Sequence, residues 1–302
     1  MKPHLIHIGW AKAGSSLLQN WFKAHPQIAF ADGGLLGVRS SFDIANGKAG
    51  DPAGIRLRVT SDETLSTPHA TAGADVIGHL AAKAPAPDPT PEQVCEHLRD
   101  LFPEAVVLIV TRGFREVILS SFSEGVKRGG MHFFAPWLEN FGSPGHHAFG
   151  KWDYDRVAAC YEAAFPGRVM VLPYELLRDR PEEFIGHLES RFSLDHAPLA
   201  GRVINKSLSA AELAWYPMFT RFVRYAPLFG WPKRRMMRSY FAAITRRGFK
   251  GFAEACQRLV PRQLPHAGMV DAAIVARFSP GAQKLRGRPA YAEYARYYLP
   301  ED

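Results

Sequence analysis

Residues 5–26, LIHIGWAKAGSSLLQNWFKAHP, decide the fold that we expect for this chain. Apolar side chains at Leu5, Ile6 and Ile8 are typical of a short buried strand. A turn with a glycine at each end follows at residues 9–14, and glycine can take backbone angles that other residues avoid. Two serines then stand where a helix would begin, and apolar residues recur at helical spacing up to residue 22. The stretch predicts a strand, a glycine turn and a helix.

Such a unit forms an anion site, because free backbone N–H groups converge at the start of the helix and its dipole favours negative charge. Lys12 adds a cation inside the turn, and Ser15 and Ser16 add hydroxyl donors. A Walker A loop needs lysine directly after its second glycine. Here Ser15 follows Gly14, and Lys12 comes before it. The residues therefore predict a phosphate-binding turn of another kind.

Strand and helix patterns alternate along the first two thirds of the chain. Further strands are expected at residues 28–31, 56–60, 105–111 and 169–172, and helices from residue 91 and at 114–127, 152–165 and 181–192. This alternation predicts an α/β fold with a parallel, doubly wound central sheet. From Ser209 and Glu212, which form a capping box, the pattern is mostly helical. We expect one domain over residues 1–302, with an α/β core in 1–208 and a helical, basic, aromatic extension in 209–302.

A second anion site is predicted after the strand at residues 105–111. Arg112 follows the C-terminal end of this strand, where ligands bind in open α/β sheets. Ser120 comes eight residues later, about two helical turns along the next helix. A guanidinium and a hydroxyl together suit a phosphate monoester.

The two sites together resemble those of sulfotransferases that use 3′-phosphoadenosine 5′-phosphosulfate (PAPS). The pattern G-x-x-K-x-G-S-S at residues 9–16 resembles their 5′-phosphosulfate loop, and Arg112 with Ser120 resembles their 3′-phosphate motif. Gly113 and Phe114 stand where that motif usually has Asp or Asn and then Pro. The segments VMVLPYELL at 169–177 and VINKSL at 203–208 match the bacterial branch. The resemblance covers roughly residues 4–210 and implies a P-loop-like sulfotransferase fold.

The resemblance implies transfer of a sulfuryl group in line from PAPS to a hydroxyl or amine. Positioning and charge stabilisation are then the main requirements, as in phosphoryl transfer. Lys12 is the candidate for the charge on the leaving phosphate. The residues implied to hold the 5′-phosphate side are Lys12, Ala13, Gly14, Ser15 and Ser16, and those for the 3′-phosphate are Arg112 and Ser120. No metal is required by this chemistry.

The general base is less well determined by the sequence. Glu63 follows the strand predicted at residues 56–60, where bacterial relatives often carry Ser-Glu. Thr60 and Glu63 also fit a helix capping box, so the residue has a structural alternative. Asp32, Asp62 and His69 are rival candidates for the base.

Composition is consistent with an anionic ligand and an intracellular enzyme. The net charge is +8, which suits nucleotides, acidic glycans or membrane lipid. Three dispersed cysteines fit a reducing compartment and show no metal-ligand spacing. No secretory signal is recognised. We expect a cytoplasmic protein, with peripheral contact at the inner membrane face as an open alternative.

Residues 233–250, the basic segment, contain seven basic residues and no acidic one. Aromatic and aliphatic residues are interleaved with them, as in helices that lie on membrane surfaces. The acceptor expected for the enzyme is a carbohydrate or glycolipid, with a small alcohol or phenol also open, and nucleic acid is not expected. Two alternative functions are a P-loop nucleotide kinase and a non-enzymatic basic module that binds membrane or nucleic acid.

Overall fold

The computed structural model describes residues 2–10, 12–30, 53–62, 65, 90–141, 152–199, 207–227 and 230–300. The chain divides into two compact units. Unit 1 comprises Met1–Gly113, Gly150–Ile204 and Phe278–Asp302, and unit 2 comprises Phe114–Phe149 and Asn205–Arg277. That residues 1–302 act as a single functional domain stays a prediction.

Unit 1 is built on a five-stranded sheet in the spatial order β2-β3-β1-β4-β5. The strands are β1 (His4–His7), β2 (Ile28–Phe30), β3 (Leu57–Ser61), β4 (Val106–Thr111) and β5 (Val169–Pro173). All four neighbouring pairs are parallel. The predicted α/β class with a central parallel sheet is confirmed.

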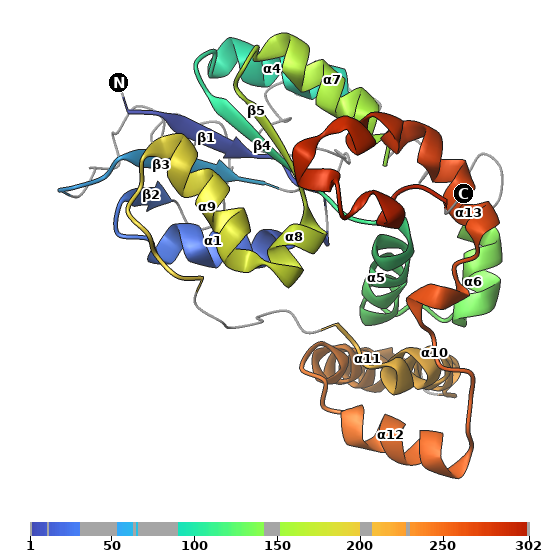
Figure 1. The fold of residues 1–302 in the computed structure, drawn as a ribbon. Coiled ribbons are helices and arrows are strands. Elements are labelled where there is room, and N and C mark those ends of the chain that lie inside the picture. The colour runs from blue at the N-terminus through green and yellow to red at the C-terminus, as the bar shows by residue number, and fades with distance from the viewer. Residues whose placement is uncertain are drawn as a thin grey trace. The chain divides into compact units, whose positions relative to one another are not determined.

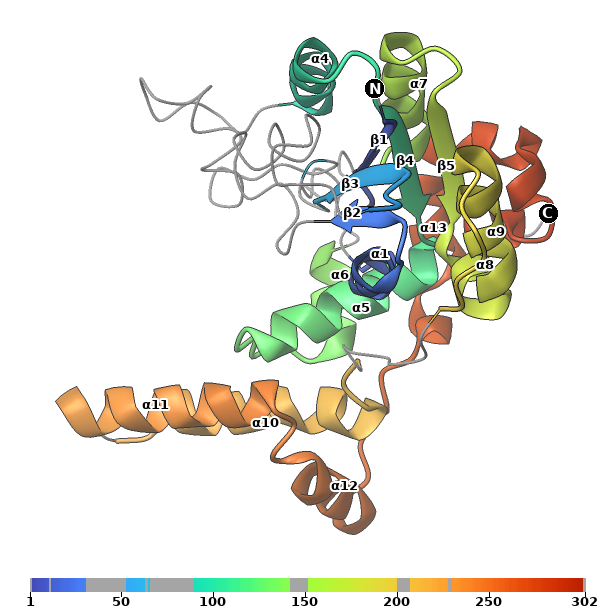
Figure 2. The same cartoon turned by 90° about the vertical axis from the view of Figure 1, so that its left-hand side faces the viewer.

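Helices cover both faces of this sheet (Figures 1 and 2). On one face lie α4 (Pro91–Leu101) and α7 (Tyr154–Ala164), and on the other α1 (Ser15–Ala24), α8 (Tyr174–Asp179) and α9 (Pro181–Phe192). Strands covered on both sides are buried along their whole length, and all six residues of β4 are buried. This is why the strand reads in sequence as an unbroken apolar run.

The C-terminal residues of the chain belong to unit 1. Three 3₁₀ helices, η4 (Ser279–Gly287), η5 (Pro289–Tyr291) and η6 (Ala295–Tyr297), form this segment. η4 packs on α7, and η5 packs on β5. The side chains of Tyr291 and Tyr298 are fully buried, and their hydroxyls lie 2.7 and 2.8 Å from Oγ1 of Thr111. The tyrosine-rich tail is thus attached to the last residue of β4.

Unit 2 is helical, as expected for the C-terminal part. Its helices are α5 (Phe114–Lys127), α6 (Phe134–Phe141), α10 (Ala210–Tyr225), α11 (Gly230–Thr245), α12 (Lys250–Leu259), η3 (Ala267–Met269) and most of α13 (Ala272–Phe278). α10 contacts α5, α11 and α12 and is therefore central to the unit.

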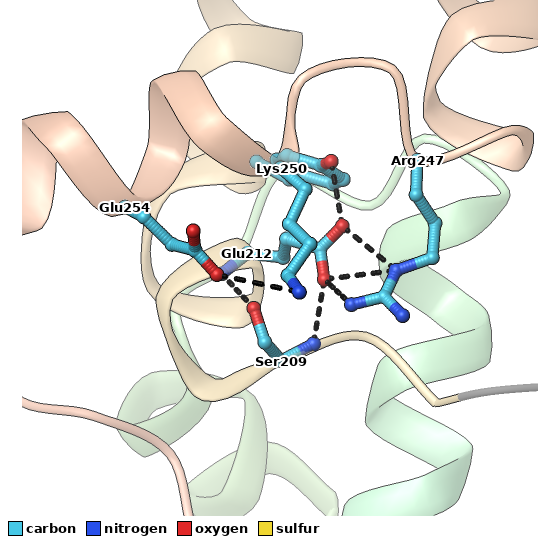
Figure 3. Close-up of polar contacts among 6 residues, drawn as sticks. Ser209, Glu212, Arg247, Lys250 and Glu254 are labelled. Atoms are coloured by element: carbon cyan, nitrogen blue, oxygen red, sulfur yellow. Dashed lines mark hydrogen bonds and ion pairs between the residues drawn. The ribbon is translucent and has the colours of Figure 1, made fainter.

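The start of α10 is a buried charged cluster (Figure 3). Ser209 caps the helix by accepting a hydrogen bond from the N–H of Glu212, and Glu212 accepts one from the N–H of Ser209. Arg247 donates to the buried Glu212 carboxylate, with an Nη2–Oε2 distance of 2.5 Å. Nearby, Lys250 pairs with Glu254 at 3.6 Å. Two cations of the basic segment, Arg247 and Lys250, are therefore neutralised within unit 2.

The rest of the basic segment is partly exposed. Arg234, Arg238 and Arg246 are exposed, whereas Tyr240 and Ile244 on the same segment are buried. Among the described residues, no helix is both long and apolar enough to cross a bilayer.

Candidate active site

The two predicted anion-binding motifs follow neighbouring strands. β1 pairs with β3 on one side and with β4 on the other, with His7 opposite both Ser61 and Leu108. Along the chain, β1 is followed by β2 and β3, which lie on one side of it, whereas β4 is followed by β5, which lies on the opposite side. The order in which strands are added to the sheet therefore reverses between β1 and β4. In open α/β sheets, ligands bind at this point, outside the carboxyl ends of the strands. The parallel pairing brings the turn after β1 and the turn after β4 to one edge.

The turn after β1 contains two residues in left-handed backbone conformation. Gly14 has a φ of 84°, as its residue type allows, but the second is Lys12, with a φ of 71°. Gly9, by contrast, does not have a positive φ. It is needed for space instead, because a Cβ at this position would lie 2.5 Å from Nε2 of His7. The expectation that both glycines serve backbone freedom is therefore correct only for Gly14.

Helix α1 starts at Ser15, and no side chain caps it. By contrast, α4 starts with a capping box made by Thr90 and Gln93. The Oγ atom of Ser15 is buried and has no hydrogen-bond partner among the described residues. A helix start leaves its first N–H groups without intrahelical acceptors, and its dipole favours an anion. The uncapped start of α1, with the buried Ser15 hydroxyl, is therefore suited to hold an anionic group.

The turn is closely backed by the start of α8. A Cβ on Gly14 would come within 2.9 Å of both the Tyr174 ring and the Leu177 side chain. Ala13 is fully buried, and its N–H donates to the carbonyl of Trp10 over 3.0 Å. No larger residue fits at Gly14 without displacing these neighbours, which fixes the course of the backbone around the helix start.

Arg112 lies against the turn after β1, which is called the first turn below; the turn after β4 is called the second turn. Its Nη1 donates to the main-chain carbonyl of Lys12 over 2.5 Å, and its guanidinium carbon lies 4.5 Å from the centre of the Tyr174 ring. The carbonyl of Arg112 accepts a hydrogen bond from the Tyr154 hydroxyl at 2.7 Å. The ring of Tyr154 in turn packs edge-on against Trp10. The structure thus brings Lys12 and Arg112 together.

The turn that follows Arg112 is fixed by a buried carboxylate. Glu175 is fully buried, and its Oε1 accepts the N–H of Gly113 at 2.9 Å. Its Oε2 accepts the hydroxyl of Tyr298 at 2.7 Å, and Thr111 donates to the same hydroxyl at 2.8 Å. Burial raises the pKa of Tyr298 well above its ordinary value, so the phenol stays protonated and donates. A residue near the C-terminus therefore helps to position the backbone beside Arg112.

Sequence reasoning assigned no role to Tyr174, Glu175 or Tyr298. The first two lie in VMVLPYELL, a segment that resembles the bacterial branch. A glutamate two residues after the end of an apolar strand was the available signal, because a carboxylate at such a position requires hydrogen-bond donors if it is buried. Tyr298 gave no signal of its own in a tail with several tyrosines.

A polar cluster of His7, Ser61 and Gln19 lies at the C-terminal ends of β1 and β3. Nδ1 of His7 lies 2.8 Å from Oγ of Ser61, which also accepts from Gln19 at 3.1 Å. Burial lowers the pKa of His7 to about 4, so the imidazole is neutral at pH 7. The N–H of Asp62 donates to the carbonyl of His7 at 3.0 Å. The segment that leads to the predicted base thus leaves β3 beside β1.

The remaining predicted residues fall elsewhere. Ser16 is partly buried in the first turn of α1. Ser120 is buried in α5 and belongs to unit 2, so its pairing with Arg112 stays a prediction. Glu63 lies outside the described residues, as do its rivals Asp32 and His69. Within the described ranges, no group of three or more His, Cys, Asp or Glu side chains is placed to hold a metal ion.

Two solved structures are similar to the chain. The sulfotransferase from Alicyclobacillus acidocaldarius shares 15% identity, with a TM-score of 0.46, over 87% of this chain and 98% of that chain. The mouse sulfotransferase SULT7A1 complexed with PAP shares 13% identity, with a TM-score of 0.38, over 84% and 88%. No curated protein matches the chain significantly in sequence.

The sequence profile described as "Sulfotransferase family" matches residues 3–198. The match begins just before β1 and takes in all five strands, the turn with Lys12 and the turn with Arg112. Because it spans well over half of the 302 residues, the chain belongs to the sulfotransferase family.

Proposed function

We propose that this sulfotransferase moves a sulfuryl group from PAPS to a hydroxyl, or an amine, of a carbohydrate or glycolipid acceptor. One observation carries the proposal most directly. The uncapped start of α1 carries the buried Ser15 hydroxyl, which has no partner within the described ranges, and it follows a turn whose Lys12 carbonyl accepts a hydrogen bond from Arg112. Two groups suited to separate phosphates are thereby held at one edge of the sheet.

The residues of the first turn fit the 5′-phosphate side of PAPS. The hydroxyls of Ser15 and Ser16 and the N–H groups of Gly14 and the α1 start would donate to phosphate oxygens. Ala13 would shape the turn, because its own N–H donates to the Trp10 carbonyl. The ammonium of Lys12 would stabilise negative charge as it develops on the leaving phosphate. This role favours turnover more than ground-state binding, because the charge is largest in the transition state.

The residues of the second turn fit the 3′-phosphate. Arg112 would donate to it through its planar guanidinium, which suits a phosphate. Ser120 is proposed to complete that contact with its hydroxyl. Recognition of a 3′-phosphate would separate PAPS from ATP and other ordinary adenine nucleotides.

When bound, PAPS supplies the sulfuryl group, whose bond to the 5′-phosphate oxygen breaks as a bond to the acceptor oxygen forms. The proton of the acceptor hydroxyl passes to a carboxylate of this chain, for which Glu63 is the proposed base. Asp62 is the rival that the structure describes, and it follows β3 beside the His7 cluster. The proposed chemistry requires no metal ion.

The class of acceptor is proposed from the positive charge of the basic segment, residues 233–250. The exposed arginines of the basic segment would suit an anionic glycan or an acceptor at a membrane surface. Peripheral attachment of a cytoplasmic enzyme through this segment belongs to the same proposal. A small alcohol or phenol is the alternative acceptor.

Calorimetric titration tests the nucleotide part of the proposal. Adenosine 3′,5′-bisphosphate should bind without added metal and at least tenfold more tightly than ATP with magnesium. Preference for Mg-ATP would instead support a nucleotide kinase, and binding of neither would support a non-enzymatic module. Mass spectrometry of glycan and lipid fractions treated with isotopically labelled PAPS would then identify the acceptor.

A further inference from the structure

Unit 2 contains a pocket lined by none of the residues assigned to the proposed transfer. It has a volume of about 230 Å³ and is formed by the start of α6, the first half of α10 and the segment between α12 and α13. The lining residues are Phe133, Phe134, Ala135, Leu213, Ala214, Arg262, Gln263, Pro265 and Met269. Most of these side chains are apolar, and one carries a positive charge.

The charged group is Arg262, which is held between aromatic rings. Its guanidinium carbon lies 4.4 Å from the centre of the Trp215 ring and 5.1 Å from that of Phe133. Nη2 lies 3.1 Å from the sulfur of Met218, a weak acceptor, and the buried Nε has no acceptor among the described residues. Arg262 thus lacks a carboxylate partner in the described part of the chain.

A second guanidinium lies against the same phenylalanine. The guanidinium carbon of Arg221 is 5.0 Å from the centre of the Phe133 ring, and its Nε donates to the carbonyl of Met131 at 2.8 Å. No acidic side chain of the described residues pairs with Arg221 either. Two guanidinium groups therefore contact one ring with no carboxylate partner among the described residues, and an anion bound beside Arg262 would lower the unfavourable local positive charge.

The position of Arg262 is fixed from behind by Gln257. The Gln257 Nε2 donates to the carbonyl of Arg262 at 2.8 Å, and its Oε1 accepts the Arg262 N–H at 3.3 Å. The same Oε1 accepts the indole N–H of Trp215 at 2.9 Å. One amide thus holds both the arginine backbone and the ring beneath its guanidinium, so the binding groups are preorganised.

We propose that this pocket binds a small organic anion with an apolar body, such as a carboxylate on a short hydrocarbon chain. The guanidinium would take the carboxylate in a paired hydrogen bond, and Phe134, Leu213 and Met269 would contact the hydrocarbon. A cavity of about 150 Å³ is enough for a benzene ring, so this pocket accommodates a chain of comparable or somewhat larger size. The inference does not depend on the proposed transfer from PAPS.

Calorimetry with three simple probes tests the site on the full chain. Sodium octanoate carries both charge and chain, 1-octanol only the chain, and sodium acetate only the charge. Octanoate should bind with a stoichiometry near one and at least tenfold more tightly than either of the others. Equal binding of octanol would mean that the arginine takes no part, and a lack of saturable octanoate binding would overturn the proposal.

Two variants connect the binding to the pocket. Arg262→Gln should weaken octanoate binding at least tenfold, whereas Arg258→Gln, which changes an exposed arginine of α12, should leave it unchanged. Equal effects of the two substitutions would mean that octanoate binds elsewhere. If Arg262→Gln does not fold, Met269→Trp decides, because the larger side chain fills the pocket and should abolish binding without removing a charge. Unaltered octanoate binding by a folded Met269→Trp variant would overturn the proposal.

Discussion

The guanidinium of Arg112 and the main-chain carbonyl of Lys12 are joined by a hydrogen bond, although 100 residues separate them. The contact links the turn after β1 to the turn after β4. Lys12 has a left-handed backbone, which is unfavourable for a residue with a Cβ. The bond from Arg112 helps to hold that conformation. Arg112 therefore has a structural role in the first turn besides its proposed contact with a phosphate.

Arg112→Ala should weaken binding of two nucleotides to different extents. The loss for adenosine 3′,5′-bisphosphate should be about 1.5–3 kcal/mol, the range for a hydrogen bond to a charged group. Adenosine 5′-phosphosulfate lacks the 3′-phosphate and should lose only about 1 kcal/mol, through the released Lys12 carbonyl. Calorimetry on both ligands measures the difference. Equal losses would show that Arg112 acts only by supporting the turn.

Lys12→Ala should abolish turnover and weaken bisphosphate binding only moderately. The reason is that the proposed charge contact strengthens as the leaving phosphate becomes more negative. Release of adenosine 3′,5′-bisphosphate from PAPS can be followed for the variant and for Lys23→Ala, a control at an exposed lysine of α1. Near-normal turnover by Lys12→Ala would remove this residue from the mechanism.

Tyr298→Phe tests whether the C-terminal tail positions the second turn. Removing the hydroxyl deprives the buried Glu175 of a donor and should destabilise the protein by roughly 1–3 kcal/mol. Because Glu175 also fixes the Gly113 N–H, bisphosphate affinity should fall further than affinity for adenosine 5′-monophosphate. Tyr297→Phe is the matched control, since its hydroxyl is on an exposed contact 3.4 Å from Arg178. Parallel losses for both nucleotides would mean a purely structural effect.

The Glu212–Arg247 pair should make stability depend on pH. Burial by itself would raise the pKa of Glu212, but hydrogen bonds from Arg247, the Ser209 N–H and Tyr216 outweigh it, so this pKa lies below its ordinary value. The pair then stabilises the fold fully above the ordinary glutamate pKa, about 4.3, and less as the pH falls through the lowered value. Urea unfolding at several pH values should show this loss for the natural protein and not for Glu212→Gln.

Arg247→Ala should lower the free energy of unfolding more than Arg246→Ala does. It leaves the buried Glu212 carboxylate without its cation, which costs about 3 kcal/mol in comparable buried pairs. Arg246→Ala removes an exposed arginine one position earlier and should change the free energy of unfolding by less than about 0.5 kcal/mol. Similar unfolding midpoints for the two variants at pH 7 would contradict the structural role of the pair.

Charge reversal in α11 tests the proposed acceptor class. Replacing Arg234, Arg235 and Arg238 by Glu should raise the acceptor KM steeply at low salt, since each basic residue near an anionic surface contributes about 1 kcal/mol. The effect should shrink with ionic strength, and PAPS affinity should not change. An unchanged, salt-independent KM would favour a small soluble acceptor.

Local sequence determined most of the elements. The apolar run of β4, the capping boxes at Thr90 and Ser209 and the glycine turn at Gly14 each depend on residues within a few positions of one another. These strands, helices and turns can therefore be predicted from the sequence without knowledge of the tertiary structure. The same holds for Lys12 and Arg112 as candidates, because Lys12 lies in the glycine turn after β1 and Arg112 directly follows β4.

Only the tertiary structure decided which of these pieces meet. That β1 lies beside β4 is a property of sheet order, and it is this pairing that places Arg112 against Lys12. The hydrogen bond from Tyr298 to Glu175 joins residues 123 positions apart, and that from Arg247 to Glu212 joins residues 35 positions apart. A buried carboxylate must find donors somewhere, so the sequence by itself determined that such partners exist. Which residues supply them depends on packing over the whole chain, and only the folded structure settles it.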